Sequence, residues 1–298
     1  MKQRPLRLGS STSSLIRSMP GDFSAIVQKS SSYTPEDHKR LCAIASECGE
    51  KLAKSDIKSI EYFVNVQMLE AGLNNPMVEM FKSMGRNVEM WSVHAPFSGV
   101  DLASPDKELR AKSVGWVSGA GKIAHDLGAK VLVVHAALEI KVNISREDRV
   151  LLAADSLRQV ADVCKPLGVT VAVEALPRTC IGNCAPELLF ILDKINRPNT
   201  GICLDVNHLI PASALSAIVR ILGERIITLH ISDHDDVDER HWLPKKGVIN
   251  WPGLVQALRE IKYKGPFMYE VGLSKPTFDE AIETLQDNYN DVMKDAAV

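Results

Sequence analysis

Short apolar runs recur along the chain, and most of them are followed by an amphipathic stretch with helical spacing. The runs are continuous rather than alternating, which is typical of strands buried on both faces of a parallel sheet. The runs that predict strands lie at residues 7–10, 57–64, 88–93, 129–134, 169–173, 201–204, 226–229 and 265–269. The stretches that predict helices lie at residues 77–84, 109–127, 146–164, 187–195, 212–222 and 252–261.

Capping signals support the boundaries of several predicted helices. Thr34 is a good N-cap, the proline after it suits the first helical position, and Asp37 stands where a capping box needs its acid. These residues predict a helix that ends near Leu52. Gly128 and Gly168 follow amphipathic stretches and are typical of helix ends.

The alternation of strand and helix predicts an α/β fold. A (β/α)8 TIM barrel repeats this unit eight times, and barrels of about 250 residues form a single domain. An open Rossmann-type sheet is the competing architecture, but no G-x-G-x-x-G motif follows the first predicted strand. We therefore expect one TIM-barrel domain over residues 1–298.

Composition narrows the classes of partner. Lys and Arg (35) nearly balance Asp and Glu (37), so the formal charge of -2 gives no overall basic field for nucleic acid or an anionic membrane. The N-terminus lacks the apolar core of a signal peptide, and no run approaches the roughly 20 apolar residues of a spanning helix. We expect a cytoplasmic protein without a membrane or nucleic-acid partner.

Residues of the types that bind metals follow many of the predicted strands. The densest group is His230, Asp233, Glu239 and His241, in the loop after the strand at 226–229. The carboxyl ends of barrel strands converge on one rim, so imidazoles and carboxylates placed there predict a divalent-metal site. The other candidates that share this placement are His94, His135, Glu174, Asp205, His208 and Glu270.

The chain resembles the xylose isomerase-like TIM-barrel superfamily, which contains sugar isomerases and epimerases, inosose dehydratases and endonuclease IV. The resemblance rests on an ordered series of motifs: WSVHAPF, VVHAA, VAVEALPR, CLDVNHL, LHISDHD, ERHWLPKKGVINW and YEVG. In the isomerase and epimerase branch, the residues that match Glu174, Asp205, His230 and Glu270 hold a divalent metal. The resemblance implies Mn²⁺ first, with Zn²⁺, Co²⁺ or Mg²⁺ as alternatives.

Such a donor set leaves coordination positions open for two adjacent substrate oxygens. We expect a sugar or sugar-phosphate isomerase or epimerase that removes a proton next to a carbonyl through an enediolate, with Glu174 and Glu270 as base and acid. Dehydratase or lyase action on a keto sugar, an inosose or a 3-keto-glycoside is the alternative. A carbohydrate-binding barrel without activity is a third hypothesis. The expected partner is a small carbohydrate, and the chain could form a homo-oligomer.

Endonuclease IV provides a further alternative, because it holds three zinc ions. Its additional ligands correspond to His94, His135, His208 and an Asp-x-His pair, for which this chain has Glu239-x-His241. The longer glutamate side chain puts the third metal in doubt. A zinc phosphodiesterase is therefore the outside hypothesis.

Other side chains are candidates for substrate contact. We expect Arg178, Trp242 and Lys245 to reach the substrate, and Lys245 with the lysine after it either attracts a phosphate or carboxylate or is simply solvated. Trp251 either lines the site or packs in the core. The Ser-rich residues 10–33 could form a lid or a mobile loop.

Overall fold

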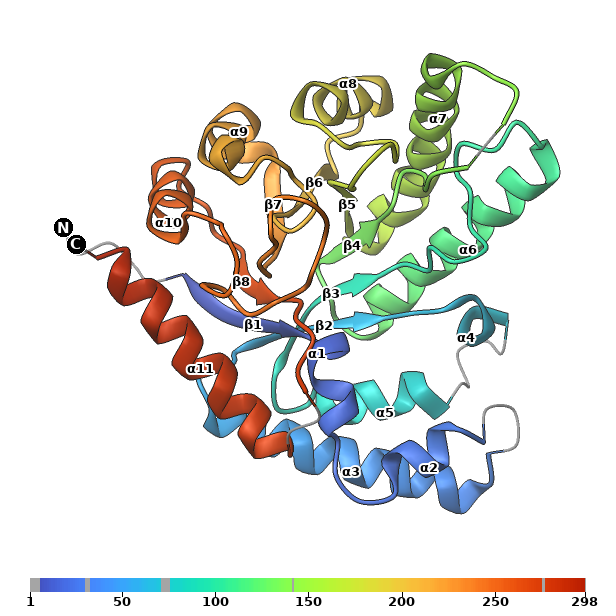
Figure 1. Ribbon diagram of the computed structural model, residues 1–298. Coiled ribbons are helices and arrows are strands. Elements are labelled where there is room, and N and C mark those ends of the chain that lie inside the picture. The colour runs from blue at the N-terminus through green and yellow to red at the C-terminus, as the bar shows by residue number, and fades with distance from the viewer. Residues whose placement is uncertain (1–5, 30–32, 71–75, 141, 275–276, 298) are drawn as a thin grey trace.

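A barrel of parallel strands forms the centre of the protein in the computed structural model (Figure 1). The structure describes residues 6–29, 33–70, 76–140, 142–274 and 277–297. Within these residues, eight strands form one sheet in the order β7-β6-β5-β4-β3-β2-β1-β8. Their bounds are β1 Arg7–Ser11, β2 Ser59–Phe63, β3 Glu89–His94, β4 Val131–Val134, β5 Thr170–Glu174, β6 Thr200–Asp205, β7 Ile226–His230 and β8 Pro266–Tyr269.

The sheet closes between β7 and β8 through a short bridge. Ile231 pairs with Tyr269 in parallel, its N–H donates to the Met268 carbonyl at 2.8 Å, and its own carbonyl accepts from Glu270 N–H at 3.0 Å. The strands therefore form a nearly closed TIM barrel, as the sequence predicts.

Helices surround the barrel as an outer layer (Figure 1). Most of the predicted helices are confirmed, with ends that differ by a few residues. The helices of the described residues are α1 Thr12–Leu15, α2 Phe23–Val27, α3 Pro35–Lys54, α4 Val66–Glu70, α5 Pro76–Met84, α6 Lys107–Asp126, α7 Arg146–Cys164, α8 Ala185–Ile195, α9 Leu215–Leu222, α10 Trp251–Glu260 and α11 Phe278–Asp295. None of them is long and apolar enough to cross a membrane.

Two local signals act as the sequence suggests, and one was overlooked. Thr34 caps α3 by accepting from Asp37 N–H, and the Asp37 carboxylate completes the capping box. Gly128 and Gly168 both have positive φ, at 75° and 69°, where glycine costs little. Helix α11 was not predicted, although Thr277 and Glu280 form a second capping box at its start.

The described part of the Ser-rich stretch at 10–33 is packed rather than an open loop. Leu15 and Phe23 are buried, each at 3% exposure. The Ser14 hydroxyl accepts from Val271 N–H at 2.9 Å, which ties α1 to the segment after β8. Residues 30–32 lie outside the described residues.

The barrel interior changes character along its axis. Val131, Val133, Ala172 and Cys203 form a small apolar cluster, against which Trp91 packs. Farther toward the carboxyl ends of the strands, the interior becomes polar and buried, with Glu174, Asp205 and His230 at 1%, 0% and 0% exposure. Trp251 packs in the main core at 2% exposure, so it does not form a wall of the site. The mouth of the barrel is thus where buried charge collects.

Candidate metal centre and active site

Four of the predicted ligands meet at the mouth of the barrel. Glu174, Asp205 and His230 end β5, β6 and β7, and Glu270 directly follows β8. Each offers one donor atom, and these atoms all lie within 4.8 Å of one another. The structure therefore brings together the set that the strand ends predict.

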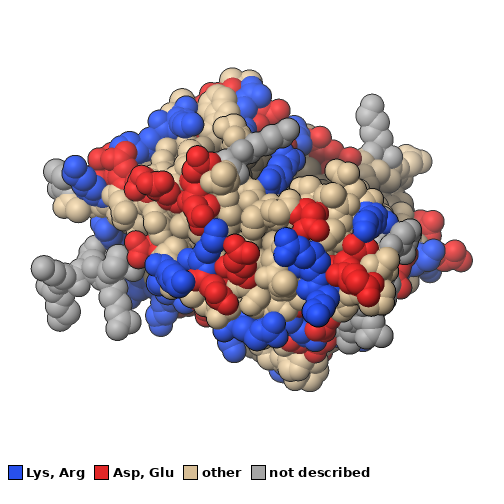
Figure 2. Space-filling model, turned by 90° about the horizontal axis from the view of Figure 1, so that it is seen from below, with Lys and Arg blue, Asp and Glu red and all other residues tan. Residues whose placement is uncertain are grey.

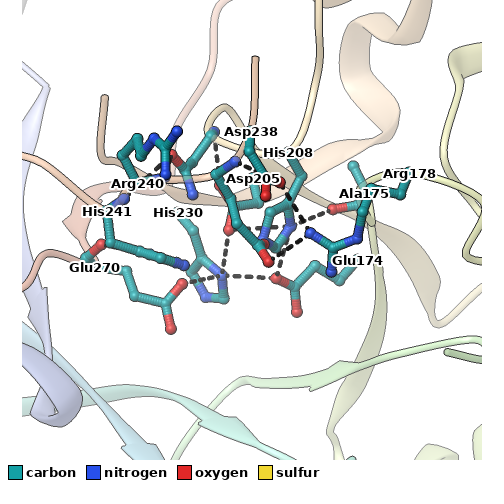
Figure 3. Close-up of polar contacts among 12 residues, drawn as sticks. Glu174, Ala175, Arg178, Asp205, His208, His230, Asp238, Arg240, His241 and Glu270 are labelled. Atoms are coloured by element: carbon teal, nitrogen blue, oxygen red, sulfur yellow. Dashed lines mark hydrogen bonds and ion pairs between the residues drawn. The ribbon is translucent and has the colours of Figure 1, made fainter. Parts of the chain in front are cut away.

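His230 lies between the two glutamates (Figure 3). Its Nδ1 atom is 3.1 Å from Glu174 Oε1, 3.1 Å from Glu270 Oε2 and 3.8 Å from Asp205 Oδ2. The Glu270 side chain is 21% exposed, whereas that of Glu174 is 2% exposed. Glu270 is therefore the more accessible of the two acids.

The donor chemistry of this cluster fits a divalent cation. Asp205 Oδ1 accepts from Asn207 N–H at 2.8 Å, but Oδ2 is buried without a hydrogen-bond partner among the described residues. Leaving a buried acceptor unsatisfied costs about 1–3 kcal/mol, more when it is charged. Three carboxylates and one imidazole facing a common point suit Mn²⁺, Mg²⁺, Co²⁺ or Zn²⁺.

Burial and neighbouring charges set the protonation of the acids. Burial raises the pKa of Asp205 to about 6. Burial also acts to raise the pKa of Glu270, but the adjacent His230 imidazole outweighs it and lowers this pKa to about 2. For Glu174, burial is likewise outweighed by His135 and His230, which hold the pKa of this carboxyl well below its usual range. The two glutamates therefore favour the ionised form.

Two further sets of ligand-type residues flank this cluster. His94 Nε2 and His135 Nε2 each lie 3.0 Å from Glu174 Oε2, and these three residues form one set. The other set is His208, Glu239 and His241, in which His208 Nε2 lies 2.9 Å from Glu239 Oε2. All five additional ligands of the zinc hypothesis are therefore near the site.

Backbone carbonyls orient several of these imidazoles. The Nδ1 atoms of His94, His208 and His241 donate to the carbonyls of Ala95, Ala175 and Glu270, at 2.7, 2.9 and 3.2 Å. A hydrogen bond at one ring nitrogen fixes the tautomer and leaves the other nitrogen free as a ligand. These three histidines therefore present Nε2 to the flanking sets.

Glu61 holds His230 by Nε2 rather than by Nδ1, and it was not among the residues that we predicted for the site. This fully buried residue of β2 places Oε1 3.0 Å from His230 Nε2, while its Oε2 accepts from Ser92 Oγ at 2.7 Å. His230 can then offer only Nδ1 to the cluster. The available signal was an acid inside a continuous apolar strand, which is rarely buried without a partner.

Arg178 reaches the mouth but is already engaged by acids. Its Nη1 atom lies 2.8 Å from Glu239 Oε1 and 3.0 Å from Asp238 Oδ1, and Nε lies 3.6 Å from Glu139 Oε2. Contacts with His208 first and with Arg178 lower the pKa of Glu239 to about 2. A metal bound by His208, Glu239 and His241 must therefore compete with Arg178 for the Glu239 carboxylate.

The structure does not bring Lys245 or Trp242 to the cluster. The Lys245 ammonium pairs with Asp291 and Asp295 of α11. Trp242 is 38% exposed and pairs through its backbone with Asp233. Neither side chain lines the cavity above the cluster.

The sequence placed Asp233 among the candidate metal ligands, and the structure corrects this prediction. Asp233 belongs to none of the three sets of ligand-type residues and instead anchors the loop after β7. Its carboxylate is fully buried and accepts from Lys245 N–H at 2.9 Å, Ile249 N–H at 3.2 Å and Trp251 Nε1–H at 2.9 Å. These hydrogen bonds occupy the lone pairs that a metal would need.

A cavity of about 360 Å³ opens directly above the clusters. Phe97, Leu138 and Leu176 form its apolar side, and Phe97 stacks on His135 with ring centroids 4.7 Å apart. Cavities of roughly 300–1,000 Å³ bind small molecules. The arrangement is that of a small-molecule site with acids and imidazoles at its floor.

Comparison with known proteins identifies the family of the fold. Residues 50–288 match the family model described as the xylose isomerase-like TIM barrel. The protein belongs to this family. Of its relatives, the L-ribulose 3-epimerase of Methylomonas sp. strain DH-1 is 29% identical over 179 residues, which cover 58% of this chain and 60% of the relative. The inosose isomerase of Bacillus subtilis strain 168 is 29% identical over 180 residues, which cover 56% of this chain and 64% of the relative.

The chain thus spans less than two thirds of the length of these curated relatives. A solved structure of D-allulose 3-epimerase from Methylomonas sp. has a TM-score of 0.74 at 18% identity and covers 99% of this chain and 100% of its own. That likeness shows a shared barrel fold along almost the whole chain.

Proposed function

We propose that the protein is a metal-dependent sugar or sugar-phosphate isomerase or epimerase that abstracts a proton next to a carbonyl. The observation that carries the proposal is the placement of Glu174 and Glu270 on either side of His230 (Figure 3), where both glutamates line the cavity above the clusters. Relatives named as an L-ribulose 3-epimerase and an inosose isomerase support the same class of substrate, a small carbohydrate.

Glu174, Asp205, His230 and Glu270 would hold the divalent metal. A donor set rich in carboxylate oxygens favours Mn²⁺, with Zn²⁺, Co²⁺ and Mg²⁺ as alternatives. When bound, such an ion polarises a substrate carbonyl and stabilises the negative charge that develops on its oxygen.

The two glutamates would share the proton transfer. One removes the proton from the carbon next to the carbonyl, and the other returns a proton through the enediolate form of the substrate. Return to the opposite face gives an epimer, and return to the neighbouring carbon gives an isomer. Loss of a leaving group instead gives dehydration, which is the alternative reaction for a keto sugar, an inosose or a 3-keto-glycoside. The apolar side of the cavity, with Phe97, Leu138 and Leu176, would exclude water from this step.

The test is turnover of a ketose and inosose panel by protein loaded with Mn²⁺. We expect Glu174→Gln to lower kcat by on the order of 10²–10⁴-fold, because the amide cannot accept the proton. Glu224→Gln is the matched control, since this exposed glutamate precedes β7 at the other end of the barrel. A Glu174→Gln protein as active as the wild type would contradict the proposal.

A zinc phosphodiesterase is the second candidate function, and the two flanking sets of ligands favour it. Two observations weigh against it. Arg178 already contacts Glu239 in one set. The formal charge of -2 gives no overall basic field for a duplex, and acidic and basic side chains are interspersed on the side of the barrel shown in Figure 2.

Metal content separates the two candidates. Elemental mass spectrometry of protein purified without chelators should find about one equivalent of metal per chain if the four-residue set acts alone. About three equivalents of zinc, together with cleavage of a duplex that contains an abasic site, would favour the phosphodiesterase instead.

A further inference from the structure

A second cavity, of about 280 Å³, lies beside the candidate active site. Its walls come from Ser13, Ser14 and Arg17 after β1 and from residues 271–273 after β8. His241 and Glu270 line both this cavity and the one above the metal ligands. The two cavities therefore adjoin at His241 and Glu270.

Arg17 is the charged side chain that this cavity adds to the site. It is exposed, and it forms no ion pair or hydrogen bond among the described residues. The two cations that the sequence proposed for substrate contact are engaged, because acids hold Arg178 and the aspartates of α11 hold Lys245. Glu270 does not pair with Arg17 and instead contacts His230. The guanidinium is therefore free to meet a ligand.

The segment that carries Arg17 is fixed to the barrel. β1 and β8 are neighbouring strands, with Ser10 paired to Tyr269. Ser14 Oγ accepts from Val271 N–H at 2.9 Å and donates to the Tyr269 carbonyl at 3.5 Å. The two walls of the cavity are thus hydrogen-bonded to each other, and the start of the Arg17 side chain has a defined position beside Glu270.

We propose that the Arg17 cavity binds an anionic group, a phosphate or a carboxylate, at the end of the substrate away from the reacting carbons. This inference rests on the proposed function and names the substrate class as a sugar phosphate or a sugar acid. A guanidinium matches both oxyanions through paired hydrogen bonds, and Val271 and Leu273 supply an apolar wall for the carbon chain. The sequence pointed to Lys245 for this role, but the structure engages that side chain elsewhere.

Anion binding without turnover is the first test. Calorimetric titration of the metal-loaded protein with inorganic phosphate, and separately with acetate, is compared between the wild type, Arg17→Gln and Arg220→Gln. Arg220 is a matched control, because it pairs with Glu260 on the outer surface. We expect Arg17→Gln to weaken binding of one of the two anions by about 10- to 100-fold, and Arg220→Gln to have no effect. Equal binding of both anions by the wild type and Arg17→Gln would overturn the proposal.

Kinetics with three classes of substrate identify the source of the anion. A phosphorylated ketose, a ketose carboxylic acid and a neutral ketose are compared in the wild type, Arg17→Gln and Arg17→Lys. We expect a rise in KM of about tenfold or more for the phosphorylated or the carboxylated substrate alone, with partial rescue by lysine. An equal loss for the neutral ketose, or no loss for any substrate, would overturn the proposal.

The two proposals fail in different ways. If the protein turns over none of these substrates but still loses anion affinity in Arg17→Gln, the anion site stands and the proposed reaction is wrong. If a neutral ketose is turned over with Glu174 dependence and no Arg17 dependence, the proposed reaction stands and the anion site is wrong.

Discussion

Asp233 offers a stringent test of how the loop after β7 is held. Replacement by alanine removes an acceptor shared by four donors: His234 N–H, Ile249 N–H, Trp251 Nε1–H and Lys245 N–H. His234, Ile249 and Trp251 are 0%, 6% and 2% exposed, so their three donors lose their partner without gaining water. At about 1–3 kcal/mol for each unsatisfied buried donor, we expect Asp233→Ala to lower the free energy of unfolding by about 3–9 kcal/mol.

Equilibrium unfolding in urea, followed by tryptophan fluorescence, measures this loss. Asp233→Asn should lose less, because the amide keeps one acceptor oxygen. Asp193→Ala is the control, since this aspartate is exposed on α8 and should change stability by no more than about 0.5 kcal/mol. A loss below about 1 kcal/mol for Asp233→Ala would mean that the loop does not depend on these hydrogen bonds.

Three further substitutions test other parts of the account. Glu61→Gln should weaken Mn²⁺ binding by about 10- to 100-fold in calorimetry, because His230 loses the carboxylate that fixes its ring. The circular dichroism spectrum should not change, and an unchanged Mn²⁺ affinity would exclude this role of Glu61. Gly247→Ala should lower the free energy of unfolding by about 1–3 kcal/mol, and with it the Tm, since the added Cβ would overlap the His234 carbonyl oxygen. A Tm equal to that of the wild type would show that the loop adapts. Lys245→Met should change KM by less than about twofold, whereas a large rise in KM would restore the substrate contact that the sequence suggested.

The sequence was sufficient to predict the barrel and most of the central cluster. Continuous apolar runs followed by acids or imidazoles can be recognised without coordinates, and parallel strands in a barrel bring their carboxyl ends together. That rule alone placed Glu174, Asp205, His230 and Glu270 on one rim. It also placed His94 there, because this residue ends β3.

The sequence was less informative wherever a side chain's role depends on a distant partner. Glu61 lies inside a strand, and only the barrel geometry shows that it faces His230 across the interior. Asp233 has the chemistry of a ligand, but the backbone N–H groups of its own loop fold back onto it. Lys245 meets Asp291 of α11, a helix that the sequence analysis did not predict. Arg17 was in a Ser-rich stretch with no recognisable motif.

In the proposed reaction, Glu174 and Glu270 move a proton at the carbon next to a substrate carbonyl. The most direct measurement is deuterium incorporation from D₂O into a ketose, followed by NMR, with the wild type and Glu174→Gln each loaded with Mn²⁺. We expect deuterium at the carbon adjacent to the carbonyl with the wild type and none above background with Glu174→Gln. Product formed by the wild type without deuterium at that carbon, or equal incorporation by both proteins, would contradict the proposed reaction.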